Sequence, residues 1–170
     1  MQDLADRHLV LIGMMGAGKT TVGRIVAARL GRPLLDSDQM IEAREGRTVR
    51  DIFRTDGEDA FRAIETEVLR EALDSPQKAV IAAAGGVVLR PENRELLKRS
   101  GARIVWLRAD PAVLVERVKS GGHRPLLDND PQGTLQQMYN DRAALYREVA
   151  DAIVSVDNRT PNEVVDAVLR

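Results

Sequence analysis

Short runs of consecutive apolar residues alternate with longer segments of helical spacing along this chain. Within the runs the apolar residues follow one another directly, as expected of strands that are buried on both faces of a sheet. Strands that alternate with helices are typical of α/β proteins with a parallel sheet. The pattern predicts five strands: His8–Ile12, Leu34–Asp36, Ala79–Ala83, Arg103–Leu107 and Ala152–Val156.

Four of the intervening segments carry recognisable helix signals. An Asp or Thr followed by proline supplies an N-cap and a favourable first helical residue. A Thr followed three residues later by Gln fits a capping box, and a glycine after the last periodic residue suits a C-cap. The predicted helices are Thr20–Leu30 ending at Gly31, Asp110–Lys119 opened by Asp110-Pro111, Thr134–Val149 opened by Thr134–Gln137, and a last helix opened by Thr160-Pro161.

Two segments depart from the alternation. Glu42–Leu73 is a long, charged, mostly helical insertion between the second and third strands. Lys119–Gly133 is rich in glycine and proline, and a loop of that length in a compact domain is usually functional or mobile. We expect it to be a lid that closes over substrate, with a tolerated surface loop as the alternative. The chain shows no repeat or interdomain linker, so residues 1–170 are expected to form a single domain.

Composition narrows the class of protein. In 170 residues, 25 Lys and Arg stand against 26 Asp and Glu, which excludes the broad basic surface of a general nucleic-acid binder. The absence of cysteine excludes disulfides, thiolate metal sites and a cysteine nucleophile. The apolar run Leu9–Ile12 is too short for a signal sequence or a membrane span. We therefore expect a cytoplasmic protein without nucleic-acid or membrane partners, and the small size without an evident apolar patch favours a monomer.

The strongest chemical motif is Gly13-Met-Met-Gly-Ala-Gly-Lys-Thr20, which fits G-x-x-x-x-G-K-[ST] between the first strand and a helix. Glycines let backbone amides curl around phosphate oxygens, and the helix adds the positive end of its dipole. Lys19 would supply charge for the β- and γ-phosphates, and Thr20 a hydroxyl for Mg²⁺. The motif predicts binding of a nucleoside triphosphate. The alternative is a glycine-rich turn with a surface lysine.

The rest of the chain favours a small-molecule kinase among P-loop proteins. It has no N-K-x-D motif of the kind that a switch GTPase needs, and a motor would need more chain. The second strand ends in Asp36-Ser-Asp38, and ligands of doubly wound sheets lie beyond the carboxyl ends of the strands. Asp36 could hold Mg²⁺ through water. Asp38 could accept a proton from a substrate hydroxyl or bind a diol, or simply cap the helix that follows it.

Further polar positions leave two interpretations open. Arg62 and Glu65 are three residues apart on a predicted helix, so they form either a surface ion pair or a rigid site for a carboxylate ligand. Ala84-Gly85-Gly86 follows the third strand, either as an ordinary turn or to let a ligand approach the backbone. Arg124 in the predicted lid could clamp a transferring phosphate. For Arg124 and Arg142 alike, a solvated surface is the alternative.

Taken together, these motifs resemble the shikimate kinase family, which has a P-loop fold of the nucleoside-monophosphate-kinase-like group. The P-loop alone indicates only nucleotide binding, whereas FR-x-x-E, RPLL and R-x-x-LY are more specific. The matching motifs, in order, are GMMGAGKT (13–20), DSD (36–38), FRAIE (61–65), AGG (84–86), RPLL (124–127) and RAALY (142–146). The resemblance implies a three-layer α/β/α fold with a five-stranded parallel sheet, a lid over residues 119–133 and a substrate-binding insertion over residues 42–73.

The resemblance also implies a reaction and site residues. The reaction is transfer of the ATP γ-phosphoryl to the 3-hydroxyl of shikimate, giving shikimate 3-phosphate and ADP in aromatic amino acid biosynthesis. Lys19, Asp38 and Arg124 are the implied catalytic residues, and Thr20 and Asp36 the implied Mg²⁺ site. The implied ATP site is Gly13, Gly16, Ala17, Gly18, Lys19, Thr20, Thr21, Arg117, Arg124 and Pro161, and the implied shikimate site is Asp38, Arg62, Gly85, Gly86 and Arg142.

Ala84 departs from the family, which usually has glycine there. If that glycine needs a positive φ or a close approach to substrate, Ala84 carries a cost, and we expect a modest effect on shikimate affinity. Two other functions stay open at this point. One is a related kinase, such as a gluconate or nucleoside-monophosphate kinase, and the other is a nucleotide-dependent regulatory module without turnover.

Overall fold

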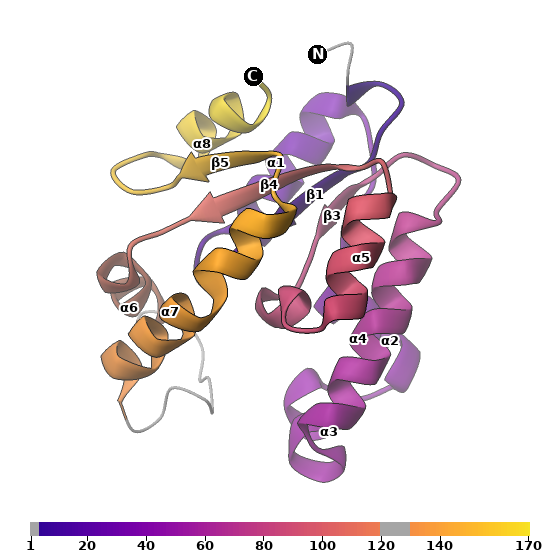
Figure 1. Ribbon diagram of the computed structural model, residues 1–170. Helices are drawn as coiled ribbons and strands as arrows, with labels where there is room; N and C mark the ends of the chain where they lie inside the picture. Colours follow the sequence, from indigo (N-terminus) through magenta and orange to yellow (C-terminus); the bar gives the residue numbers. More distant parts are fainter. Residues whose placement is uncertain (1–3, 120–129) are drawn as a thin grey trace.

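The fold is built on a parallel sheet of five strands (Figure 1). A computed structural model describes residues 4–119 and 130–170. Every neighbouring pair of strands is parallel, and the order across the sheet is β2-β3-β1-β4-β5. The predicted parallel α/β fold is therefore confirmed. The strands are β1 (Leu9–Ile12), β2 (Leu34–Asp36), β3 (Val80–Ala82), β4 (Arg103–Arg108) and β5 (Ala152–Ser155), within two residues of their predicted ends.

Helices cover both faces of the sheet. Because β1 lies in the middle with a helix layer on each side, all four of its residues are fully buried, which explains why its apolar residues are consecutive. On one face α1 and α8 pack against each other, and on the other α7 contacts α5 and β4 (Figure 1). The helices are α1 (Lys19–Leu30), α2 (Ser37–Glu45), α3 (Val49–Asp56), α4 (Glu58–Leu73), α5 (Pro91–Arg99), α6 (Pro111–Lys119), α7 (Pro131–Val149) and α8 (Pro161–Val168), with a 3-10 turn η2 (Gly85–Val88).

Several helix ends confirm the sequence signals. Gly31 ends α1 with a φ of 63°, in the left-handed region that glycine adopts readily. The Asp110 carboxylate accepts from the Ala112 amide at 2.9 Å, before α6. The Thr160 hydroxyl accepts from the Glu163 amide at 3.2 Å, before α8.

One predicted cap, at Thr134, is wrong, and so is the alternative that Asp38 caps a helix. Helix α7 begins at Pro131 instead of Thr134, because Asp130 accepts from the Gly133 amide at 3.1 Å and Pro131 occupies the first turn. This Asp-Pro signal is the one that also opens α6, and it takes precedence over the capping box. The cap of α2 is Asp36, whose Oδ1 accepts from the Gln39 amide at 3.2 Å, so Asp38 does not cap that helix.

The charged insertion consists of α2, α3 and α4. It contains a hydrophobic cluster separate from the main core, made by Ile41, Ile52, Phe61 and Val68, all at most 3% exposed. The C-terminal half of α4 joins the main core through Leu69 and Ala72. Helix α4 thus fixes the insertion beside the carboxyl ends of β2 and β3, which places its inner face next to the P-loop.

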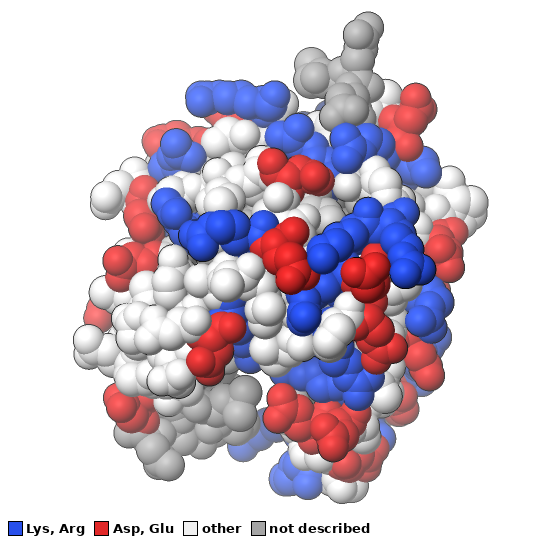
Figure 2. Space-filling view, viewed as in Figure 1, with Lys and Arg blue, Asp and Glu red and all other residues white. Residues whose placement is uncertain are grey.

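The viewed surface carries charges of both signs, interspersed without one large basic area (Figure 2).

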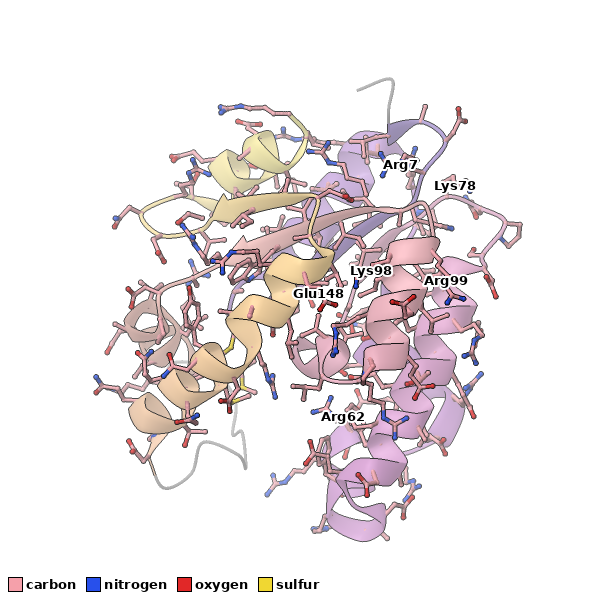
Figure 3. The ribbon with its side chains drawn as sticks, in the orientation of Figure 1. Arg7, Arg62, Lys78, Lys98, Arg99 and Glu148 are labelled. Carbon is pink, nitrogen blue, oxygen red and sulfur yellow. The ribbon has the colours of Figure 1, made fainter. Side chains whose placement is uncertain are left out.

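Between α5 and α7, Lys98 and Glu148 point toward one another (Figure 3), and both Lys98 Nζ and Arg94 Nε lie 3.0 Å from the Glu148 carboxylate. Within residues 4–119 and 130–170, no helix has the length and apolar character needed to cross a bilayer.

The stability of the fold should depend on pH through His8. This side chain is 4% exposed before β1, and its Nδ1 accepts from the Ala79 amide at 3.1 Å, which only an unprotonated nitrogen can do. Burial, with the positive charge of Lys78, lowers the pKa of His8. Because the unfolded chain then binds the proton more readily, the free energy of unfolding should be fully maintained above about pH 6.5 and fall below it.

Urea unfolding at about pH 7.5 and about pH 5.5 measures the fall in the free energy of unfolding. We expect a fall of roughly 1–3 kcal/mol, the cost of losing the hydrogen bond between the Ala79 amide and His8. His8→Asn should be less stable than the parent at the higher pH and should lack most of the pH dependence. The matched control is His123→Asn, because His123 is the chain's other histidine and should not carry the effect. Equal pH dependence in the parent and His8→Asn would contradict the assignment.

Candidate active site

Two cavities adjoin one another at the carboxyl ends of the strands. The first, here the P-loop pocket, has a volume of about 460 Å³ and is lined by the loop before α1 and the ends of β2 and β3. The second, here the insertion pocket, has about 470 Å³ and lies between α3, α4, η2 and α7. The residues that line both are Met15, Asp38, Ala84 and Gly85. These four residues therefore form the boundary that the two pockets share.

The P-loop has the conformation that its sequence predicts. Gly18 before α1 has a φ of 96°, in the left-handed region. At Gly13 any side chain would clash with the carbonyl oxygen of Leu107 at the end of β4. Lys19 Nζ donates to the carbonyl oxygens of Gly13 at 2.6 Å and Met14 at 3.0 Å. The ammonium group therefore lies over the loop, at the rim of the pocket.

A hydroxyl and a carboxylate come together in the lining of the P-loop pocket. The Thr20 hydroxyl, in the first turn of α1, donates to Asp36 Oδ2 at the end of β2 over 2.7 Å. Hydroxyl and carboxylate oxygens are ligands that Mg²⁺ prefers in nucleotide sites, where it also retains phosphate and water ligands. The sequence prediction that these two residues come together is correct.

Two arginines, Arg117 and Arg159, also line the P-loop pocket. Arg117 of α6 donates through Nη1 to the carbonyl oxygens of Gly16 at 3.1 Å and Ala17 at 3.2 Å. Arg159, from the loop between β5 and α8, and Pro161, the first residue of α8, line the same pocket. Arg159 was not predicted as a site residue, although it is only two residues from Pro161.

The insertion pocket contains a buried ion pair. Arg62 is 8% exposed and Glu65 fully buried, and Arg62 Nη1 donates to both Glu65 carboxylate oxygens, at 3.1 and 3.2 Å. Figure 3 shows Arg62 on the side of α4 that faces α7. Burial raises the pKa of Glu65, while the positive charge of Arg62 opposes that rise. The alternative of a surface ion pair is therefore wrong.

Aromatic rings complete the surroundings of Arg62. Its guanidinium lies 5.3 Å from the centre of the Phe61 ring and 6.0 Å from that of Phe53, within the range of cation–π contacts. No sequence motif indicated that Phe53 would line a pocket, although Val49 and Phe53 are four residues apart on α3. The further lining residues that were not predicted are Met15, Val49, Arg50, Phe53, Arg54, Phe61 and Met138.

The turn after β3 forms one wall of the insertion pocket. A side chain at Gly86 would clash with the Arg62 guanidinium, so only glycine leaves room for that group against the backbone. Arg142 of α7 is 7% exposed, and its Nη1 lies 3.5 Å from where a side chain at Gly85 would begin. Ala84 has a φ of −61° and a ψ of 152°, so this position needs no positive φ.

The predicted residues gather at these two pockets with clear exceptions. The P-loop pocket is lined by Gly16, Ala17, Gly18, Lys19, Thr20, Thr21, Asp36, Asp38, Gly85, Arg117 and Pro161, and the insertion pocket by Asp38, Arg62, Gly85, Gly86 and Arg142. Gly13 shapes the loop without lining the pocket. Arg124 lies outside the described residues.

Proteins with similar sequences share one description. The family model described as "Shikimate kinase" matches residues 15–170. The shikimate kinase of Symbiobacterium thermophilum is 44% identical over 165 residues, which cover 95% of this chain and 94% of the relative. The shikimate kinase of Cupriavidus pinatubonensis is 47% identical over 163 residues, which cover 95% of this chain and 84% of the relative.

Solved structures agree with this result. Shikimate kinase from Acinetobacter baumannii, in complex with shikimate, has a TM-score of 0.91 and 37% identity, covering 96% of this chain and 90% of that one. Shikimate kinase from Aquifex aeolicus has a TM-score of 0.82 and 33% identity, covering 95% and 94%. A gluconokinase from Sinorhizobium meliloti shares the fold alone, with a TM-score of 0.55 and 21% identity. The chain belongs to the shikimate kinase family.

Proposed function

We propose that the two adjoining pockets divide the substrates of the family's reaction between them, with ATP in the P-loop pocket and shikimate in the insertion pocket. The reaction transfers the γ-phosphoryl of ATP to the 3-hydroxyl of shikimate, giving shikimate 3-phosphate and ADP in aromatic amino acid biosynthesis. The observation that carries this assignment is the shared lining, because Asp38 and Gly85 face both pockets. A phosphoryl group can then pass between the substrates without leaving the site.

On the ATP side, the P-loop amides and Lys19 bind the phosphates. Lys19 exchanges its bonds to the carbonyls of Gly13 and Met14 for bonds to phosphate oxygens, so its charge is already positioned before ATP arrives. Arg117 contacts one side of the adenine and Pro161 the other, since both line the P-loop pocket. The glycine-rich loop and Thr21 complete the phosphate site.

Mg²⁺ fits the oxygen pair of Thr20 and Asp36. Their 2.7 Å hydrogen bond holds both groups beside the phosphate-binding amides. Thr20 would bind the ion directly and Asp36 through water, leaving the other ligand positions to phosphate oxygens. When bound, the ion supplies positive charge against the phosphate oxygens.

On the shikimate side, Arg62 and Arg142 bind the carboxylate of the ring. Both guanidinium groups are almost fully buried, so a ligand that offered them no carboxylate would leave buried charges poorly paired. The site should therefore disfavour an uncharged ring. Glu65 holds the Arg62 guanidinium in place. The backbone of Gly85 and Gly86 lies against the ring, and Asp38 orients the 3-hydroxyl and can accept its proton.

Arg124 neutralises the transferring phosphoryl group, together with Lys19. The transition state of phosphoryl transfer is loose, so catalysis depends mainly on positioning and on neutralising charge.

We also propose that residues 119–133 act as a lid, that residues 1–170 form one domain, and that residues 42–73 bind shikimate. Ile153 is the only exposed large apolar side chain among the described residues, which supports a monomer. ATP is supplied in the cytoplasm, where we place the enzyme, without nucleic-acid or membrane partners.

The function is tested by ADP release in a coupled assay, with shikimate, gluconate, AMP and CMP as acceptors. We expect turnover with shikimate alone. Turnover with gluconate or a nucleoside monophosphate would mean that the arginines of the insertion pocket are misassigned. ATP binding without turnover on any of these acceptors would make the protein a regulatory module instead.

Replacing Arg62 by lysine should impair shikimate binding while keeping the positive charge. Lysine cannot reproduce the planar fork that pairs with Glu65 and a carboxylate together, so KM for shikimate should rise by roughly tenfold or more. KM for ATP should stay within about a factor of two, since Arg62 does not line the P-loop pocket. The matched control is Arg70→Lys on the exposed side of the same helix. An unchanged KM for shikimate in Arg62→Lys would contradict the assignment.

Exchanging glycine and alanine within the turn tests the space beneath Arg62. Gly86→Ala places a methyl group where the guanidinium lies, so KM for shikimate should rise by roughly tenfold through displacement of Arg62. The reverse change, Ala84→Gly, is the control: its backbone is ordinary, so KM should change by less than about threefold, while stability should fall by about 0.5–1 kcal/mol. Steady-state kinetics and thermal unfolding measure both effects. A larger effect on KM from Ala84→Gly than from Gly86→Ala would contradict this explanation.

A further inference from the structure

A buried phenol contacts the wall that the two pockets share. Tyr146 of α7 is fully buried, and its hydroxyl donates to the carbonyl oxygen of Gly85 at 2.5 Å. It is absent from the lining of both pockets. The reaction as assigned above does not use this side chain, although it holds a residue that faces both substrates.

Tyr146 is held rigidly in the core. Its ring packs against Trp106 of β4, with the ring centres 5.4 Å apart and the planes inclined at 31°. Trp106 is itself almost completely buried in the central part of the sheet. Burial raises the pKa of Tyr146 to about 12, while the nearby Arg142 guanidinium opposes that rise. The phenol therefore keeps its proton and remains a hydrogen-bond donor at any pH at which the enzyme works.

The bond to Gly85 fixes the orientation of one peptide group. In a trans peptide the carbonyl and the amide N–H point in opposite directions. Because Tyr146 holds the Gly85 carbonyl, the amide of Gly86 points away from Tyr146, and Gly86 lines the insertion pocket whereas Tyr146 does not. The preceding residue is fixed from the start of α2, since the Ala84 amide donates to the Ser37 hydroxyl at 2.9 Å.

Tyr146 also lies one helical turn after Arg142, on the same face of α7. The Arg142 guanidinium approaches Gly85, so the phenol, the guanidinium and the turn meet at one place. Helix α7 itself is tied to α5 through the bonds of Glu148 to Arg94 and Lys98. A shift of the Gly85 carbonyl would therefore disturb both the backbone and the arginine that face the acceptor substrate.

We propose that Tyr146 is a positioning residue for the acceptor site: its hydroxyl orients the Gly85–Gly86 peptide and aligns it with Arg142. This inference rests on the proposed placement of shikimate in the insertion pocket. Tyr146 touches neither substrate. It acts through Gly85, so its contribution should appear in the binding of shikimate and not in the binding of ATP.

Tyr146→Phe removes the hydroxyl alone and keeps the packing on Trp106. We expect KM for shikimate to rise by about five- to twentyfold, with kcat falling less and KM for ATP staying within about a factor of two. Tyr139→Phe is the matched control, because it removes the chain's other phenol hydroxyl from the same helix. It should leave both KM values unchanged.

The outcomes separate this proposal from the proposed function. If the parent protein shows no turnover with shikimate, the proposed function fails. If the parent turns over shikimate but Tyr146→Phe matches Tyr139→Phe, the positioning role is overturned. Equal losses of shikimate and ATP binding in a folded variant would also overturn it, because they would indicate a general effect on the site.

A second measurement keeps the hydroxyl and so applies even if Tyr146→Phe fails to fold. In the Tyr139→Phe background Tyr146 is the only tyrosine, and it can be labelled biosynthetically with 3-fluorotyrosine. Its fluorine resonance should shift on saturation with shikimate, through Gly85 and Arg142, and shift less with the non-hydrolysable ATP analogue AMP-PNP. No shift with shikimate would overturn the proposal.

Discussion

The insertion pocket, where we propose that the acceptor binds, depends on one buried ion pair, that of Arg62 and Glu65. Moving two such ions out of water has a desolvation cost on the order of several kcal/mol each, and their mutual attraction offsets it only with good geometry. Here both carboxylate oxygens accept from one nitrogen of the guanidinium, and Phe53 and Phe61 pack near it. The other terminal nitrogen, Nη2, donates to Glu58 Oε1 at 3.4 Å, so two carboxylates of α4 hold the guanidinium in a fixed orientation at the pocket. The missing side chain of Gly86 makes this arrangement possible.

This pair also explains how much of the site the sequence reveals. The spacing of Arg62 and Glu65 is equally suitable for an exposed ion pair, and only the packing of α2, α3 and α4 decides that both are buried. Local signals were sufficient for the strands, the P-loop and the meeting of Thr20 with Asp36, because each depends on neighbouring residues or on strand ends. The cap at Asp36 and the start of α7 at Pro131 were missed because two adjacent candidates competed at each place. Met138 belongs to no motif, and Tyr146, although it ends the RAALY motif, gives no sign in the sequence that it will bond to the turn after β3.

The fold itself does not select the substrate. A gluconokinase has the same overall arrangement at 21% identity, so the parallel sheet and its helices serve more than one acceptor. The side chains that line the insertion pocket come from α3, α4, η2 and α7, which are separate in sequence and meet only in the fold. The P-loop pocket, in contrast, includes one continuous stretch of lining residues, from Met15 to Val22. Sequence motifs therefore identify the donor substrate more directly than the acceptor.

The separate hydrophobic cluster of the insertion has a consequence for local unfolding. Ile41, Ile52, Phe61 and Val68 form a cluster separate from the main core, so α2, α3 and α4 up to Val68 can open as a cooperative unit while the sheet stays intact. Amide hydrogen exchange in that unit then reports its own opening free energy instead of the global one. A ligand bound against α3 and α4 protects this unit first, whereas a ligand on the P-loop, next to the buried strand β1, protects the most slowly exchanging part of the molecule.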